Sequence, residues 1–218
     1  MRTRIKVCGI TRPEDARAAV EAGVDAIGLV FYEPSPRYVD IATACAIARE
    51  VPGFVTLVGL FVNANRDDIS RIKSEVPLQL LQFHGDETAP ECQDFELPYI
   101  KALRVGTQKG ALCGDNLVDT IGSHEHASGI LLDTYRKGVP GGTGEQFDWE
   151  LMPNVDRRLI LAGGLHPQNV GKAVQKVKPY AIDCSGGVES APGIKDAGRI
   201  RALSNAVRQA DSLIYAHI

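Results

Sequence analysis

Two residues that lie far apart in the chain have side chains suited to acid–base chemistry. Cys8 ends a short apolar run and is followed at once by Gly9, and Asp133 follows the apolar run Ile130-Leu131-Leu132. A thiolate removes protons and a carboxylic acid donates them, once their surroundings adjust ordinary pKa values of about 8.5 and about 3.9. The two residue types therefore suggest proton transfer on a bound substrate.

Each of these residues also has a structural interpretation. Free cysteine is among the most buried residue types, so Cys8 alone is typical of a core position. Asp133 alone fits the cap of a helix or loop, although the apolar residues before it could shield its carboxyl and hold its proton. No cation adjacent to Cys8 in the sequence would lower its pKa. The source of a thiolate is therefore left to the tertiary structure.

Glycine-rich turns after the last three apolar runs indicate an anion site. Backbone N–H groups in such turns approach a phosphate without hindrance from a Cβ atom. One Gly-Gly pair is more typical of an ordinary turn, but three clusters at neighbouring strand ends favour phosphate. The residues predicted to bind substrate here are Gly142, Gly144, Gly163, Gly164, Asp183, Ser185, Gly186 and Gly187.

Arg37 is a further candidate for binding a substrate. It lies in the proline-stiffened segment Ser35-Pro36-Arg37-Tyr38. A guanidinium forms a bidentate pair with a carboxylate, and the structural alternative is a solvated loop arginine.

Short apolar runs alternate with helical patterns along the whole chain, and these elements must position the candidates. The runs read as strands at 4–8, 25–31, 54–62, 78–83, 98–104, 129–133, 158–162 and 180–184. Helices are predicted at 13–22, 40–50, 65–75, 167–177 and 195–210, and the polar stretch 105–128 allows a further short helix.

Eight strand–helix repeats without a break in composition predict an α/β fold, a single-domain (β/α)8 TIM barrel with eight parallel strands over residues 1–218. A doubly wound open sheet is the structural alternative, but the glycine-rich nucleotide loop typical of its first turn is absent. In a barrel the active site lies at the C-terminal ends of the strands, where Cys8, Asp133 and the glycine turns fall.

Composition excludes several classes of partner. The net charge of −3 is not that of a nucleic-acid-binding protein, and no apolar run is long enough for a membrane helix. The five cysteines are widely spaced, without a C-x-x-C pair. This pattern argues against a disulfide framework or a structural zinc site and favours the reducing cytoplasm.

The motifs together resemble one known family. In chain order, the matching segments are Lys6-Val7-Cys8-Gly9-Ile10-Thr11, Ser35-Pro36-Arg37-Tyr38, Leu57 to Asn63, Gln82-Phe83-His84-Gly85-Asp86-Glu87, Leu131-Leu132-Asp133, Gly141-Gly142-Thr143-Gly144, Phe147-Asp148-Trp149, Leu161 to Leu165, Asp183 to Glu189, and Pro192-Gly193 with Lys195-Asp196. Over nearly its entire length the chain resembles phosphoribosylanthranilate isomerase of tryptophan biosynthesis.

The resemblance implies an Amadori rearrangement without a cofactor, in which N-(5-phosphoribosyl)anthranilate becomes 1-(o-carboxyphenylamino)-1-deoxyribulose 5-phosphate. Asp133 would protonate the furanose ring oxygen, and Cys8, as thiolate, would remove the proton from C2′. Arg37 would bind the anthranilate carboxylate, and the glycine turns would hold the phosphate.

Two positions depart from the family pattern. Gly186 stands where the family usually has serine, which puts phosphate affinity in doubt rather than the chemistry. Phe83 stands where leucine is usual, which we interpret as a packing change. His84, beside it, is interpreted as a structural or loop histidine.

Other functions are compatible with the same fold. One is a different phosphate-binding barrel enzyme, such as indole-glycerol-phosphate synthase or ribulose-phosphate epimerase. The former is expected to present lysine at strand ends, whereas Lys6 and Lys101 lie inside strands, and the latter is expected to show metal-binding histidines. Another is a non-catalytic phosphate-binding barrel. The sequence leaves open a monomer or a homodimer.

Overall fold

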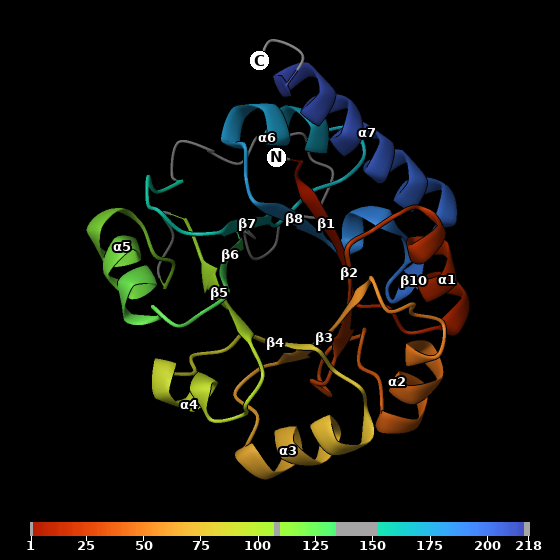
Figure 1. The fold of residues 1–218 in the computed structure, drawn as a ribbon, viewed down its shortest axis with the longest axis vertical. Helices are drawn as coiled ribbons and strands as arrows, with labels where there is room; N and C mark the ends of the chain where they lie inside the picture. Colours follow the sequence, from red (N-terminus) through yellow and green to blue (C-terminus); the bar gives the residue numbers. More distant parts are fainter. Residues whose placement is uncertain (1, 107–109, 134–151, 216–218) are drawn as a thin grey trace.

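Eight parallel strands form a closed barrel. The computed structural model describes residues 2–106, 110–133 and 152–215. The strands pair in sequence order, and β1 pairs with both β2 and β8 (Figure 1). They are β1 (Arg4–Cys8), β2 (Ala26–Val30), β3 (Thr56–Phe61), β4 (Leu80–Phe83), β5 (Tyr99–Arg104), β6 (Gly129–Asp133), β7 (Leu159–Ala162) and β8 (Ala181–Cys184). The predicted barrel is confirmed, and each strand lies within its predicted range.

Helices cover the outside of the barrel. Local signals start several of them: Pro13 stands in the first turn of α1, and the side chains of Asp40 and Asn65 accept backbone N–H groups at the starts of α2 and α3. The helices are α1 (Pro13–Glu21), α2 (Ile41–Ala48), α3 (Arg66–Glu75), α4 (Ala89–Gln93), α5 (Gly114–Ser123), α6 (Val170–Val177) and α7 (Ala197–Tyr215).

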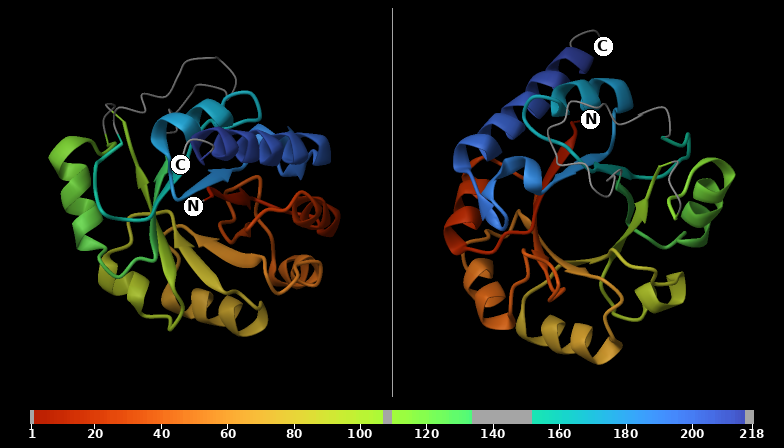
Figure 2. Two further views of the ribbon diagram at one scale, coloured as in Figure 1. Left: turned by 45° about the horizontal axis from the view of Figure 1, so that its top comes forward. Right: turned by 180° about the vertical axis from the view of Figure 1, so that it is seen from behind.

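Two further views show these helices as an outer ring around the sheet (Figure 2). α7 packs against α1 and α6, so the last helix completes the ring where β8 meets β1. Among the described helices, none combines the length and the apolar character that crossing a membrane requires.

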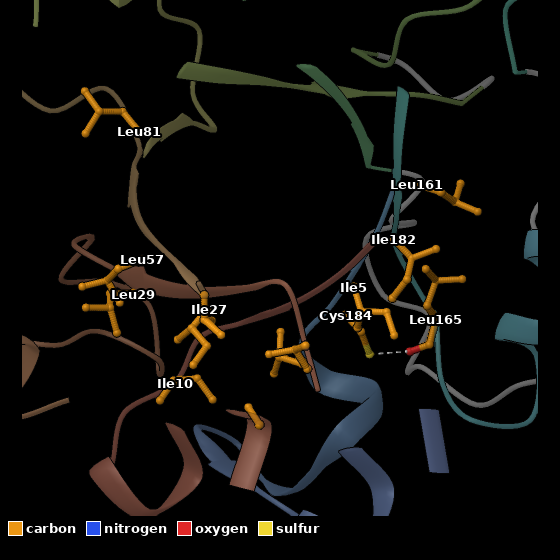
Figure 3. Packing of buried hydrophobic residues seen from close by; sticks show 14 of the residues in the cluster. Ile5, Ile10, Ile27, Leu29, Leu57, Leu81, Leu161, Leu165, Ile182 and Cys184 are labelled. Carbon is orange, nitrogen blue, oxygen red and sulfur yellow. Dashed lines mark hydrogen bonds between the residues drawn. The ribbon is translucent and has the colours of Figure 1, made fainter. Parts of the chain in front are cut away.

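The strand side chains divide into two layers because successive residues point to opposite faces of a sheet. Outward-facing residues such as Ile27, Leu57 and Leu81 pack with the helices in one large core (Figure 3). Inward-facing residues form separate clusters, one of which contains Leu131 and another Cys8. Cys8 therefore faces the inside of the barrel, at the end of its strand.

The largest correction to the predicted elements concerns residues 189–197. The helix predicted over 195–210 begins instead at Ala197 and continues to Tyr215. The residues before it form a small antiparallel hairpin, β9 (Glu189–Ala191) and β10 (Ile194–Lys195), which turns at Gly193 with φ +79°. The hairpin follows a short 3₁₀ turn, η2 (Gly186–Val188). Lys195 is thereby removed from the helix and buried.

Two other elements were weakly signalled by the sequence. The helix allowed within 105–128 is α5, and the five-residue α4 was not predicted. α4 is short enough that a capping box, Thr88 with Glu91, accounts for much of its local signal.

Candidate active site

Cys8 shares the inner face of the barrel with a buried ion pair. Lys6 precedes it by two residues on β1 and therefore points to the same side. The Lys6 Nζ atom lies 2.9 Å from Oδ2 of Asp183, and the two side chains are only 5% and 8% exposed. Register explains the contact, since Lys6 and Asp183 are partners across the β1–β8 seam. The ammonium that the sequence did not reveal is thus supplied from the same strand.

The charges around Cys8 act in opposite directions. Burial raises the pKa of the Cys8 thiol, the nearby Lys6 ammonium lowers it, and the Asp183 carboxylate raises it again. The net pKa lies above the ordinary value, so the expected lowering is not observed. Burial also disfavours the charge on Lys6, but Asp183 and the Cys8 sulfur outweigh it and raise the pKa of Lys6. Lys6 therefore carries its positive charge beside the sulfur at neutral pH.

Glycine on the neighbouring strand makes room for this pair. Gly28 is the register partner of Cys8 on β2. A Cβ atom at Gly28 would lie 2.7 Å from the Cys8 Sγ atom and 3.1 Å from the Lys6 Nζ atom. Both distances are too short for an unstrained contact, so a side chain here would displace the thiol or the ammonium.

Arg37 is held by an ion-pair network. Its Nε and Nη2 atoms each lie 2.7 Å from an oxygen of Glu189, in a bidentate pair. Lys195 Nζ donates to the same carboxylate at 2.7 Å and to the carbonyl of Ser185 at 3.2 Å. Although burial opposes it, pairing with Arg37 and Lys195 lowers the pKa of Glu189. Arg37 is therefore an oriented residue, and the solvated-loop alternative is wrong.

Gly9 lets Arg37 approach the barrel mouth. It adopts φ +73°, a left-handed conformation that favours glycine, and a Cβ atom there would overlap the Arg37 side chain. The same Cβ atom would lie 3.1 Å from the hydroxyl of Ser185. The glycine directly after Cys8 thus brings together the loops that follow β1, β2 and β8.

The turns after β7 and β8 lie against each other. Gly163 and Gly164 both have positive φ values, +88° and +62°. A Cβ atom at Gly187 would overlap the carbonyl oxygen of Leu165, and the Cys184 thiol donates to that same oxygen at 3.1 Å (Figure 3). Close contact between the two glycine turns is the arrangement that the phosphate prediction requires.

Asp133 contacts a histidine that follows β4, a strand separated from β6 only by β5. His84 Nε2 lies 3.1 Å from Oδ2 of Asp133, and Gln82 Nε2 lies 3.1 Å from Nδ1 of the same ring. His84 follows β4 and shares the inner face with Gln82, two residues before it. His84, which the sequence analysis interprets as a structural or loop histidine, is thus in direct contact with a predicted site residue.

The predicted residues thus fall into three groups at one mouth of the barrel. Cys8 and Asp183 meet through Lys6, Arg37 lies beside the glycine turns, and Asp133 ends β6, which β7 and β8 separate from β1. Gly142 and Gly144 lie outside the described residues.

Five residues that were not predicted for the site lie within these groups: Lys6, Gln82, His84, Glu189 and Lys195. For the first three, alternation along a strand was the available signal, because each precedes or follows another inward-facing polar residue by two positions. Lys101, the other buried lysine on the strands of the barrel itself, points out of the barrel and bonds Glu87 at 2.8 Å, so it presents no amine to the mouth.

Comparison with known proteins decides the family. A family model described as N-(5'phosphoribosyl)anthranilate (PRA) isomerase matches residues 5–206. The chain belongs to the phosphoribosylanthranilate isomerase family.

Individual members of the family are similar along nearly their whole length. The N-(5'-phosphoribosyl)anthranilate isomerase of Pseudomonas aeruginosa is 59% identical over 206 residues, which cover 94% of this chain and 95% of that protein. The crystal structure of the Thermotoga maritima enzyme has a TM-score of 0.85 at 39% identity and covers 95% of this chain and 99% of its own. Another isomerase, solved in complex with reduced 1-(o-carboxyphenylamino)-1-deoxyribulose 5-phosphate, has a TM-score of 0.79 at 35% identity, covering 95% of this chain and 99% of its own.

Membership of the phosphoribosylanthranilate isomerase family makes this chain an isomerase of tryptophan biosynthesis. The residues that catalyse its reaction are proposed below from the three polar groups at the barrel mouth.

Proposed function

We propose that the chain converts N-(5-phosphoribosyl)anthranilate into 1-(o-carboxyphenylamino)-1-deoxyribulose 5-phosphate with Cys8 as general base and Asp133 as general acid. The observation that carries this assignment is that both residues face inward at the C-terminal mouth, each beside a polar partner. Lys6 stands beside the thiol and His84 beside the carboxyl. Neither partner would be needed at an ordinary core cysteine or a loop cap.

The reaction proceeds in two proton transfers. Asp133 gives its proton to the furanose ring oxygen, the bond from that oxygen to C1′ breaks, and the nitrogen lone pair forms a protonated imine. Cys8 then takes the proton from C2′, and the electron pair of that bond neutralises the imine to give an enolamine. Tautomerisation of the enolamine yields the ketone. The substrate carbons C1′ and C2′ exchange oxidation states, so no external oxidant or reductant is consumed.

Lys6 supports the base, because the raised pKa of Cys8 makes the thiolate unfavourable to form. A cation held beside the sulfur favours the thiolate over the thiol and reduces that cost. The ion pair with Asp183 keeps the ammonium at this place without adding a net charge to the barrel.

The remaining predicted residues bind substrate. Arg37 receives the anthranilate carboxylate with the part of its guanidinium that Glu189 leaves open, since Nε and Nη2 are engaged. The Oδ1 atom of Asp183 is buried and has no hydrogen-bond donor within the described part of the chain, so we assign it a substrate hydroxyl. The phosphate is assigned to Gly163, Gly164, Ser185, Gly186 and Gly187, with Gly142 and Gly144 as further contacts.

We also place the enzyme in the cytoplasm, as a monomer or a homodimer. All five cysteines are free, which suits a reducing compartment.

The test follows the loss of fluorescence of enzymatically generated phosphoribosylanthranilate. We expect Cys8→Ala and Asp133→Asn each to lose about 10²- to 10⁴-fold in turnover, the usual contribution of a general acid or base. Cys45→Ala, at a half-buried cysteine of α2, and Asp119→Asn, at an exposed carboxylate of α5, are the matched controls and should keep full activity. Full turnover by Cys8→Ala would remove the assigned base, and no activity of the unmodified protein would remove the function.

A further inference from the structure

Three polar side chains form a continuous chain inside the barrel, behind the proposed general acid. Gln82 is fully buried on β4, and its Nε2 atom lies 3.1 Å from Nδ1 of His84. The other ring nitrogen of His84, Nε2, lies 3.1 Å from Oδ2 of Asp133. Each ring nitrogen of His84 thus has a partner among the described residues. The positions of the protons along these three side chains follow from which partner donates each hydrogen bond and which accepts it.

The Gln82 amide decides the tautomer of the ring. A neutral imidazole carries a single N–H, and an amide nitrogen donates hydrogen bonds but accepts none. Because Gln82 faces the ring with its Nε2 atom, Nδ1 of His84 is the acceptor of this contact. The ring therefore carries its hydrogen on Nε2 and donates it to Oδ2 of Asp133. Oδ2 can accept this hydrogen bond both in the carboxylate and in a carboxylic acid protonated on the other oxygen.

Gln82 makes this contact although the other atom of its amide has no donor. Its Oε1 atom is buried and receives no hydrogen bond from the described part of the chain. A buried acceptor without a donor is unfavourable, and such a group is retained where it has a function.

We propose that Gln82 and His84 are positioning residues for the general acid. The Gln82 amide holds His84 as the neutral Nε2–H tautomer, and this N–H fixes Oδ2 of Asp133. The acid proton is thereby assigned to the other carboxyl oxygen. The inference rests on the proposed role of Asp133 as acid.

Other charges lie near the chain and stay unchanged in the test. Arg104 of β5 is the register partner of Asp133. Behind β4, Lys101 Nζ donates to the carbonyl of Gly85 at 2.9 Å and pairs with Glu87.

Two substitutions of Gln82 separate the tautomer from simple packing. Gln82→Glu replaces the donor with an acceptor of nearly the same shape, and Gln82→Met removes hydrogen bonding while retaining an unbranched side chain. Gln79→Glu makes the same change near the start of β4, where the Gln79 side chain is exposed and its Oε1 accepts from the backbone of Leu57. It is the matched control.

The measurement is nitrogen NMR of the imidazole rings at neutral pH, together with kcat. We expect a neutral Nε2–H ring for His84 in the unmodified protein and in Gln79→Glu. In Gln82→Glu we expect an imidazolium and a loss of about tenfold or more in kcat, the scale of a misplaced catalytic group. In Gln82→Met the ring stays neutral but populates both tautomers, and kcat falls less. His166, which faces the oxygen of Gln168 at 2.8 Å, is the internal reference and should not change.

Two results would overturn the proposal: a wild-type His84 that is Nδ1–H or doubly protonated, or a Gln82→Glu protein whose ring remains neutral in the Nε2–H form. Because the NMR signal needs no turnover, it is read separately from the activity of Asp133→Asn. If Asp133→Asn were fully active while the tautomer result held, the assignment of the acid would fail and the hydrogen-bonded chain would stand.

Discussion

Removing the ammonium of Lys6 tests the link between the buried ion pair and the base. Lys6→Met keeps an unbranched side chain that is one atom shorter, and it leaves Asp183 as an uncompensated buried carboxylate. At 2.9 Å and an effective dielectric constant of about 20, the Lys6–Asp183 attraction is about 6 kcal/mol before desolvation. Breaking one partner of such a buried pair costs about 3–5 kcal/mol in the free energy of unfolding. We expect Lys6→Met to lose stability in this range.

The same substitution changes the thiol. In the unmodified protein burial raises the pKa of Cys8, and the Lys6 ammonium opposes that rise. Without the ammonium the pKa rises further, so less thiolate exists at any pH below it. If the pKa of Cys8 rises by about one, the fraction of Cys8 present as thiolate falls about tenfold. The rate of Cys8 alkylation falls by the same factor. The value of kcat/KM should fall together with the alkylation rate.

The assay measures iodoacetamide alkylation of Cys8 against pH, with each cysteine followed by mass spectrometry. Cys113 is exposed and free, so it serves as the reference thiol in the same sample. Urea unfolding, followed in parallel, gives the stability. Lys6→Met and its control, Lys101→Met, are assayed under conditions in which both are fully folded.

Lys101→Met provides the matched control. Lys101 forms a second buried pair, with Glu87 at 2.8 Å and side-chain exposures of 4% and 7%, but it points out of the barrel. We expect a similar loss of stability and an unchanged alkylation profile for Cys8. If Lys6→Met alkylated with the same pH dependence as Lys101→Met, the reasoning that Lys6 acts on the base would be refuted.

Three further predictions follow from the same mouth of the barrel. Gly28→Ala should lower kcat while the protein folds, because the new methyl group would lie 2.7 Å from the Cys8 sulfur; Gly53→Ala, which meets nothing within 4 Å, should retain activity in the same assay. Gly186→Ser should fold normally and lower KM, since its Cβ atom would meet a neighbour only at 3.4 Å and its hydroxyl can donate to phosphate; an unchanged or higher KM would contradict this. Glu189 has a pKa lowered from 4.5, so its contribution to stability is present above pH 4.5 and is lost as the pH falls through the lowered pKa. Urea unfolding should show that Glu189→Gln is less stable than the unmodified protein at neutral pH. It should also show that Glu189→Gln loses less stability on acidification.

The positions of the strands and the direction of Cys8 were predictable because they depend on short stretches of chain. Apolar runs of four to six residues bounded by polar or glycine residues identify buried parallel strands, and all eight were found within their predicted ranges. The alternation of a strand then fixes which side chains face inward. Lys6 and Gln82 were predictable by this rule alone, from their two-residue spacing to Cys8 and His84.

The hairpin before α7 was not predictable in the same way. The helical spacing of Ile200, Leu203 and Val207 is correct for α7, but it does not show where the helix begins. Lys195 leaves the helix because burying its ammonium against Glu189 and the Ser185 carbonyl stabilises the turn after β8. Contacts of this kind depend on the loop after β8 having already formed.

The sequence by itself determined the barrel and the thiol and carboxyl that end two of its strands, at the mouth where we propose that the chemistry occurs. Only the tertiary structure decided what stands beside them: Lys6 pairs with a residue 177 positions away, Arg37 with one 152 away and His84 with one 49 away. The physical reason is that strand formation and side-chain alternation are local, whereas the environment that shifts a pKa or selects a tautomer consists of charges that closure of the barrel brings together.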